Sequence, residues 1–229
     1  MKIFDIDAHP PIDIRQRRRF FNLLSSLGIS GICGTVSADG ITDEKCALAL
    51  NEAALRLAED EPSYIPALWG FPGLLEKISG AGLICVDTSI RDELGDITGY
   101  AEMSGIPVCL CHETPESASL ILEKFPRALI IAGGNWSSGF DPLKSVEMLE
   151  KYPNFYLSLS AGVWTVNYVL HELIHRMPTD RLLFGTGFPY TNPSSKLAAI
   201  KWELRDTNNE TRERVFYKNA CELFGGLMI

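Results

Sequence analysis

The sequence has 229 residues, of which 46% are hydrophobic and 22% are charged, so one domain with a large core is expected and global disorder is excluded. The formal net charge of -8 at pH 7 argues against nucleic acid or an anionic membrane as a partner, because a phosphate-rich surface would repel most of the chain. No secretory hydrophobic region follows Met1 and no apolar run is long enough to cross a bilayer, so we expect a cytoplasmic protein.

Short apolar runs alternate with longer amphipathic stretches along the chain. The runs are rich in Ile, Val, Leu or Cys and lack a clean polar alternation, which is typical of parallel strands buried on both faces. The predicted strands are Ile3–Ala8, Ile29–Gly34, Tyr64–Trp69, Gly82–Asp87, Pro107–Cys111, Ala128–Ala132, Phe155–Leu159 and Leu182–Gly185. The predicted helices are Arg17–Leu27, Asp43–Glu59, a short turn at Leu74–Ile78, Asp92–Met103, Pro115–Lys124, Pro142–Lys151, Val163–Arg176, Ser195–Leu204 and a last helix at Glu210–Leu223.

The repeated order of strand then helix predicts parallel strands joined by right-handed crossovers. Eight such units favour a closed (β/α)8 TIM barrel over an open doubly wound sheet. No Gly-x-Gly-x-x-Gly follows the first strand and no Walker-type phosphate loop occurs, which removes the simplest nucleotide-binding alternatives. We therefore expect a single α/β domain over residues 1–229, with the last helix added to the barrel.

In such a barrel, ligands bind at the carboxyl ends of the strands. From the first strand to the eighth, these ends carry His9, Thr35, Trp69, Asp87, Cys111-His112-Glu113, Asn135-Trp136, Ser158 or Ser160, and Thr186-Gly187 with Tyr190. A small-molecule ligand at the barrel mouth is therefore predicted to contact Trp69, Cys111, Glu113, Asn135, Trp136, Thr186 and Tyr190. Tryptophans at or after three strands (Trp69, Trp136 and Trp164) favour an apolar or ring-shaped ligand, although the same residue type equally fills cores.

Several segments resemble the amidohydrolase superfamily, in the branch that includes uronate isomerase and decarboxylase-like proteins. They are Ile6-Asp7-Ala8-His9, Asn51 with Pro62–Gly70, Gly105–Val108, Arg181–Pro189 and Asn219–Phe224. The resemblance spans nearly the whole chain and is most specific at the eighth strand and the C-terminus. It implies a barrel that holds one or two divalent ions. The implied ligands are a His-x-His pair on the first strand, one His on each of the fifth and sixth strands, and an Asp on the eighth strand that is also the general base.

Most of the ligand positions that the resemblance implies carry other residues here. The second first-strand His, the sixth-strand His and the eighth-strand Asp are replaced by Pro11, Gly133 and Gly187. On the fifth strand, counting places Cys111 at the ligand position, and the neighbouring His112 points to the other face unless the strand is bulged. Because a catalytic zinc usually has at least three protein ligands, we expect neither a tightly bound catalytic metal at the mouth nor another cofactor.

Two functions remain open at this point. The first is a metal-free small-ligand-binding protein, a pseudoenzyme with a degenerate metal site. The second is a divergent hydrolase or lyase that acts on a small cyclic or carboxylated substrate, with acid–base chemistry by His9, Asp87 and His112. Against the second function, Asp87 also fits a role as the cap of the next turn, and Glu113 fits a solvated loop.

Three other patterns are expected to be structural. The segment His171-Glu172-Leu173-Ile174-His175 matches a metalloprotease zinc motif, but it lies outside the barrel and has only Glu203 as an obvious third ligand, so at most weak or adventitious zinc is expected there. The basic run Arg15–Arg19 is read as a solvated helix face, with attraction of an anionic substrate as the alternative. The six scattered cysteines are expected to be reduced thiols without a metal motif. Relatives of this kind are often dimers, so the resemblance suggests a homodimer.

Overall fold

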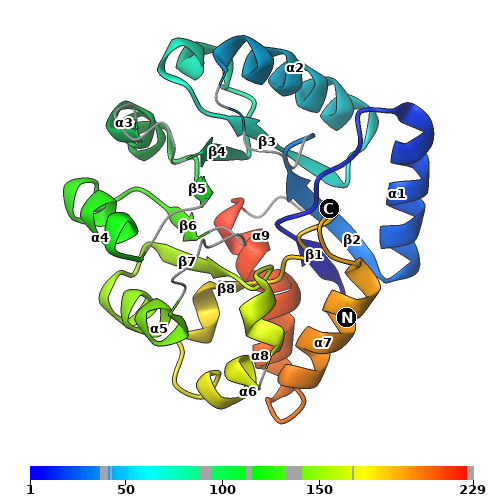
Figure 1. Ribbon diagram of the computed structural model, residues 1–229, viewed down its shortest axis with the longest axis vertical. Coiled ribbons are helices and arrows are strands. Elements are labelled where there is room, and N and C mark those ends of the chain that lie inside the picture. The colour runs from blue at the N-terminus through cyan, green and yellow to red at the C-terminus, as the bar shows by residue number, and fades with distance from the viewer. Residues whose placement is uncertain are drawn as a thin grey trace.

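The computed structural model describes residues 1–36, 41, 43–87, 94–111, 115–132, 141–166 and 168–225, with the backbone alone at 115–117. Eight parallel strands form one sheet in the order β1 to β8, and the helices surround them in a ring (Figure 1). The strands are β1 (Ile3–Asp5), β2 (Ile29–Gly34), β3 (Tyr64–Trp69), β4 (Leu83–Asp87), β5 (Val108–Cys111), β6 (Ile130–Ala132), β7 (Phe155–Ser158) and β8 (Leu182–Leu183). The predicted TIM barrel is confirmed.

The helices of the ring follow the strands in chain order. They are α1 (Ile14–Ser26), α2 (Glu44–Asp60), α3 (Leu94–Ser104), α4 (Pro115–Lys124), α5 (Pro142–Lys151), α6 (Val169–Leu173), α7 (Pro193–Glu203), α8 (Asn209–Glu213) and α9 (Asn219–Leu223). Shorter turns are η1 (Pro72–Lys77), η3 (Gly162–Thr165), η4 (Thr179–Arg181) and the π-turn η5 (Arg214–Lys218). Side chains of Asp13, Asp43, Asp141 and Asn192 accept hydrogen bonds from the first backbone amides of α1, α2, α5 and α7, which fixes where these helices begin.

The first and last strands are joined by the residues that follow them. Ile6 N donates to Phe184 O at 3.0 Å, and Ala8 forms a parallel bridge with Phe188. His9 N then donates to Phe188 O at 3.1 Å. The segment after β1 is thereby fixed to the segment after β8, at the end of the barrel where the candidate residues lie.

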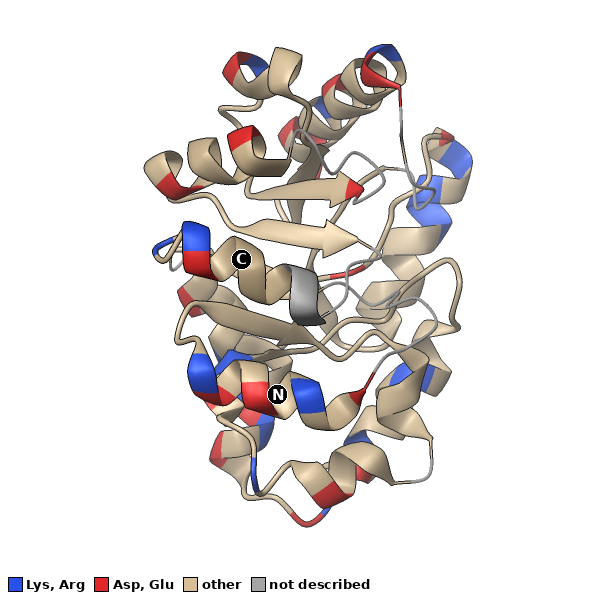
Figure 2. Cartoon of the chain, turned by 60° about the vertical axis from the view of Figure 1, so that its left-hand side comes forward, with Lys and Arg blue, Asp and Glu red and all other residues tan. Residues whose placement is uncertain are grey.

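The core has two layers. Alternate residues of the strands point into the barrel, among them Phe4, Cys33, Ala67 and Ile131, and Phe224 beyond α9 stacks on Phe4 at a ring distance of 5.6 Å. Helix α9 lies across the centre of the ring and closes the amino-terminal end of the barrel (Figure 1). The other strand faces pack against the helices, and Lys, Arg, Asp and Glu lie mainly on the outer elements (Figure 2).

One predicted helix, Val163–Arg176, is wrong. The chain forms the 3-10 turn η3 and the short helix α6 instead, and Tyr168 adopts a left-handed conformation with φ of 59° before α6. The β-branched residues Val163, Thr165 and Val166 disfavour a helix there. In the described part of the chain, no helix is long and apolar enough to cross a membrane.

Candidate functional site at the barrel mouth

His9 is held by hydrogen bonds at both ring nitrogens. Its Nδ1 lies 3.2 Å from Thr35 O and 3.0 Å from Thr35 Oγ1, and its Nε2 lies 3.0 Å from Asp7 Oδ1. A carbonyl and a carboxylate can only accept, so the arrangement suits an imidazolium that donates at both nitrogens. Burial alone would lower the pKa of His9, but the hydrogen bond and the charge of Asp7 outweigh burial and raise that pKa.

Asp7 lies between two cationic groups. Burial would raise the pKa of Asp7, but the hydrogen bond and charge of His9, a hydrogen bond from Ser160 and the charge of Lys196 together lower it. Lys196 is only 5% exposed, and its Nζ donates to Ala161 O at 2.7 Å. Burial lowers the pKa of Lys196 to about 8, against the opposing charge of Asp7. The mouth thus holds a half-buried carboxylate with an imidazolium and an amine.

A fully buried carboxylate, that of Asp5, connects β1 to the segment after β8. Its Oδ1 accepts from Thr186 N at 2.9 Å and from Asp7 N at 3.1 Å, and its Oδ2 accepts from Thr186 Oγ1 at 2.6 Å. Burial raises the pKa of Asp5 to about 6, although these hydrogen bonds oppose the shift. The hydroxyl of Thr186, a predicted ligand contact, is therefore bound to Asp5.

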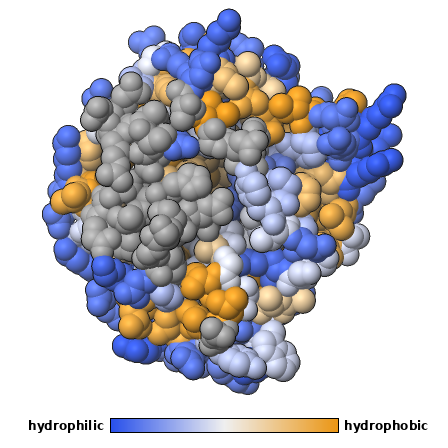
Figure 3. All heavy atoms as spheres, in the orientation of Figure 1, coloured by the Kyte–Doolittle hydropathy of each residue, from blue (hydrophilic) through white to orange (hydrophobic). Residues whose placement is uncertain are grey.

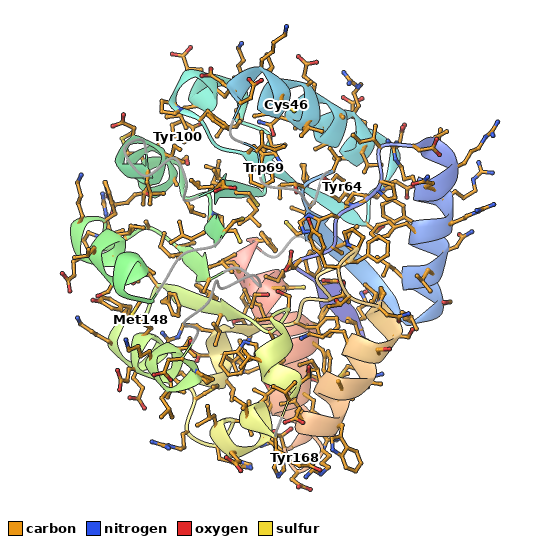
Figure 4. The ribbon with its side chains drawn as sticks, in the orientation of Figure 1. Cys46, Tyr64, Trp69, Tyr100, Met148 and Tyr168 are labelled. Carbon is orange, nitrogen blue, oxygen red and sulfur yellow. The ribbon has the colours of Figure 1, made fainter. Side chains whose placement is uncertain are left out.

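Trp69, another predicted ligand contact, ends β3 on the inner side of α2 (Figure 4). Its backbone is fixed by the buried Asn51 of α2, whose Nδ2 donates to Trp69 O at 2.9 Å and whose Oδ1 accepts from Trp69 N at 2.7 Å. The indole is 4% exposed, and its Nε1 has no hydrogen-bond partner among the described residues. A buried N–H without an acceptor is rare in folded proteins.

Replacing Asn51 by Asp is expected to lower the free energy of unfolding by about 2 kcal/mol, because Trp69 O loses its donor while Trp69 N keeps an acceptor. Urea denaturation monitored by tryptophan fluorescence measures the change. Glu52→Gln, on the exposed face of the same helix, is the matched control and should change stability by less than about 0.5 kcal/mol. Equal effects of the two substitutions would contradict the anchoring role of Asn51.

Three cysteines that the sequence leaves scattered come together on β4 and β5. The Sγ atoms of Cys85, Cys109 and Cys111 lie within 4.8 Å of one another. Hydrogen bonds from Cys109 and Cys85 lower the pKa of Cys111 well below its usual range, and the charge of His9 acts in the same direction. Sequence reasoning missed this group, although the Cys-x-Cys spacing in β5 places Cys109 and Cys111 on one strand face.

The structure describes only some of the other predicted site residues. Asp87 ends β4, is 9% exposed and lies opposite Cys111 in the β4–β5 register. Tyr190 is 56% exposed beyond β8. The predicted residues His112, Glu113, Asn135 and Trp136 fall outside the described residues. For His9, the structure supplies Asp7 as the carboxylate partner, which sequence reasoning did not select.

The part of this face that the structure describes is mixed in character, with hydrophilic side chains at the periphery and hydrophobic patches between them (Figure 3). Hydrophilic side chains project where α1 lies, and Ile14, Arg15, Arg18, Arg19 and Asn22 of that helix line a shallow surface hollow. Three residues of the basic run are therefore on the outer surface of α1, whereas Arg17 donates to Pro11 O and Ile12 O in the segment before the helix.

The family model described as Amidohydrolase (Amidohydro_2) matches residues 90–226 of the chain. The chain belongs to the amidohydrolase family. No curated protein matches the chain.

Solved structures agree with this amidohydrolase fold. An uncharacterised TIM-barrel protein from Bordetella bronchiseptica is 18% identical over 99% of both chains, with a TM-score of 0.73. The 2,6-dihydroxybenzoate decarboxylase from Rhizobium is 14% identical over 98% of both chains, with a TM-score of 0.72. The 5-carboxyvanillate decarboxylase from Novosphingobium aromaticivorans, solved with manganese and a nitrobenzoic acid, is 13% identical over 90% of this chain and 79% of its own, with a TM-score of 0.67.

The metal centre implied by the amidohydrolase resemblance does not fit the residues present at the described positions. Both ring nitrogens of His9 are bound to Thr35 and Asp7, and Pro11 carries no donor atom. Gly187, at the position of the eighth-strand Asp, has φ of 68°, a conformation that strains any residue with a side chain. The sixth-strand position, Gly133, lies outside the described residues.

The zinc motif of the sequence is also not assembled in this amidohydrolase. Helix α6 ends at Leu173, so His171 and His175 do not share a continuous helix. His171 Nδ1 lies 3.1 Å from Glu203 O, and Glu203 Oε2 accepts from the backbone N of His171. Among the described residues, the cysteine group on β4 and β5 is the only set of three such donors close enough for a metal.

Proposed function

We propose that this amidohydrolase-family barrel is a metal-free binding protein for a small ring-shaped carboxylic acid, which it takes up at its mouth. The observation that carries the proposal is the commitment of both His9 ring nitrogens to Thr35 and Asp7. A histidine held in this way donates its protons to the protein, and the Asp7 carboxylate balances its charge, so the positive charge left in this group is that of Lys196. This arrangement supports binding of an anion rather than coordination of a divalent ion.

The ligand class follows from the groups around the mouth. The Trp69 indole, which is 4% exposed, supplies a buried N–H that has no acceptor among the described residues. Lys196 and His9 supply positive charge at Asp7. Two of the solved relatives are decarboxylases named for ring acids, and one of them has been solved with 2,6-dihydroxybenzoate. A benzoate-like acid brings an acceptor for the Trp69 N–H and a negative charge for Lys196.

The second candidate is a hydrolase or lyase that works without a metal. Its support is the Asp7–His9 pair, since a carboxylate 3.0 Å from an imidazole is a common acid–base arrangement. In the predicted set of His9, Asp87 and His112, the partner of His9 would then be Asp7. Binding is favoured over catalysis because the Nδ1 of His9 is also engaged, which leaves no ring nitrogen directed at a substrate.

Calorimetric titration of the full chain with 2,6-dihydroxybenzoate, benzoate and cyclohexanecarboxylate tests the proposal. We expect the aromatic acids to bind equally well with a chelator and with added manganese. Trp69→Phe should weaken binding by about 10-fold or more, because one hydrogen bond to a charged acceptor is lost. Trp202→Phe is the matched control, since Trp202 is 58% exposed on α7.

Three results would oppose this function. Binding that requires manganese would show that a metal centre exists after all. Absence of binding by every acid would remove the ligand class. Release of carbon dioxide or another product during the titration would favour the lyase, and loss of that turnover in Asp7→Asn with retained binding would identify Asp7 as part of its chemistry.

A further inference from the structure

We propose that Cys85, Cys109 and Cys111 form a binding site for one thiophilic metal ion, and that monovalent copper is the ion whose chemistry fits best. Their Sγ atoms already lie within 4.8 Å of one another. Three sulfurs on one ion at about 2.3 Å stand about 4 Å apart, so the site closes with side-chain movements of less than about 1 Å. This site is separate from the proposed ligand-binding function.

The parallel register of β4 and β5 brings the three thiols together. Cys85 is the register partner of Cys109, and Asp87 is the partner of Cys111. Residues 109 and 111 are two apart, so their side chains point to the same face of β5, which is the inner face of the barrel. The donors therefore come from neighbouring strands of a rigid sheet rather than from loops.

The surroundings favour a soft ion. Thiolates select Cu(I), zinc and iron–sulfur clusters over hard cations. Cys85 is 5% exposed, while Cys109 and Cys111 are partly exposed, so an ion can reach the thiols. Apolar residues of the inner wall, among them Ala67 and Ile131, belong to the same cluster as the three cysteines.

The number of donors distinguishes copper from zinc. Structural zinc is almost always four-coordinate. In the described part of the chain, no fourth His, Cys, Asp or Glu joins the three thiols. Cu(I) is stable with three thiolates, which makes it the better match.

The three cysteines also differ from the metal centre implied by the family. Two of them, Cys85 on β4 and Cys109 on β5, lie at positions where that centre has no ligand. The cysteine group shares no residue with the Asp7–His9 pair, although the charges of Cys111 and His9 act on each other. Acid binding is therefore measured on the metal-free chain and metal loading without acid, so that failure of one leaves the other standing.

Anaerobic titration of the reduced full chain with Cu(I), in competition with a bicinchoninate chelator, tests the site. We expect one Cu(I) per chain after desalting, and X-ray absorption that fits three sulfur neighbours. Cys109→Ser and Cys111→Ser should each weaken Cu(I) binding by more than about 100-fold, which exceeds the effect of losing an outer-shell partner. The same titration with Zn²⁺ measures the competing ion.

One variant controls for other thiols, and the thermal midpoint controls for folding. Cys46→Ser removes an exposed thiol on α2, far from β5 in the ring, and should leave Cu(I) binding unchanged (Figure 4). Because Cys85→Ser alters a buried position, Cys109→Ser and Cys111→Ser carry the test, and each is first shown to keep the thermal midpoint of the parent chain. Copper retained by either variant, fewer than three sulfur neighbours, or a disulfide formed within the group in place of bound metal would overturn the proposal. Tighter binding of Zn²⁺ than of Cu(I) would overturn the assignment of copper.

Discussion

Replacement of Asp7 by Asn is expected to lower the free energy of unfolding at pH 7 by about 3 kcal/mol, because it leaves the His9 imidazolium without its carboxylate. The side chains of His9 and Asp7 retain 16% and 23% exposure, so the effect should lie at the lower end of the range for a broken buried ion pair. Urea denaturation, monitored by far-UV circular dichroism, measures it.

The pair also predicts how stability changes with pH. The pKa of His9 is raised, so its contribution is fully present below 6.5, its ordinary pKa, and is lost as pH rises through the folded-state pKa. The pKa of Asp7 is lowered, so its contribution is present above 3.8 and is lost as pH falls through the folded-state pKa. The stabilisation from the pair should therefore be largest between these two limits, and Asp7→Asn should remove that maximum.

A double-mutant cycle separates the pair from its surroundings. Asp7→Asn combined with His9→Gln should be less destabilising than the sum of the single changes, because each single change already breaks the same contact. Asp180→Asn is the control, since the Asp180 side chain is 60% exposed in its ion pair with Arg181 and its replacement should change stability by less than about 1 kcal/mol. Additive effects within about 0.5 kcal/mol would show that Asp7 and His9 are not coupled.

The strands were the most predictable part of this molecule. Both ends of β2 (Ile29–Gly34) and β3 (Tyr64–Trp69) are as predicted, because a parallel strand buried on both faces leaves an apolar run bounded by polar or turn residues. The helix expected over Val163–Arg176 was not, because a hydrophobic pattern does not reveal the left-handed residue Tyr168 that separates η3 from α6.

The site residues could be predicted from the sequence only where their position on a single strand identifies them. His9 was found because it follows the first strand, but its contact with Thr35 depends on how the segment after β1 lies beside β2. Lys196 lies on α7, far from Asp7 in sequence, and no spacing rule connects the two. The thiols on β4 and β5 were considered one at a time, because only the register between these strands shows that they meet.

Asp5 should give the free energy of unfolding a second dependence on pH, with the opposite sign to that of Asp7. Burial raises its pKa from 3.8 to about 6, so the folded chain binds this proton more tightly than the unfolded chain. The stability from Asp5 is therefore fully present below 3.8 and is lost as pH rises through about 6. A shift of this size corresponds to about 3 kcal/mol.

Asp5→Asn removes the titration while keeping most of the polar contacts. Its amide oxygen can accept from the backbone amides of Thr186 and Asp7, and its NH₂ group can donate to the Thr186 hydroxyl oxygen. We expect the variant to be more stable than the parent chain at pH 7 by about 2 kcal/mol, since reversing the Thr186 hydroxyl contact costs about 1 kcal/mol. At about pH 4 the difference should vanish or change sign.

The comparison is made as the difference in unfolding free energy between variant and parent at each pH, so that contributions from other groups cancel. Asp5→Ala is the informative control, because it removes the charge and also leaves the backbone amides of Thr186 and Asp7 without an acceptor, and it should be destabilising at every pH. A difference between Asp5→Asn and the parent that stays constant from about pH 4 to pH 7 would contradict the raised pKa. The oxygens of Asp5 connect β1 to the segment after β8, where the barrel closes. We infer that this connection outweighs the cost of a buried charge, which explains a carboxylate at this position.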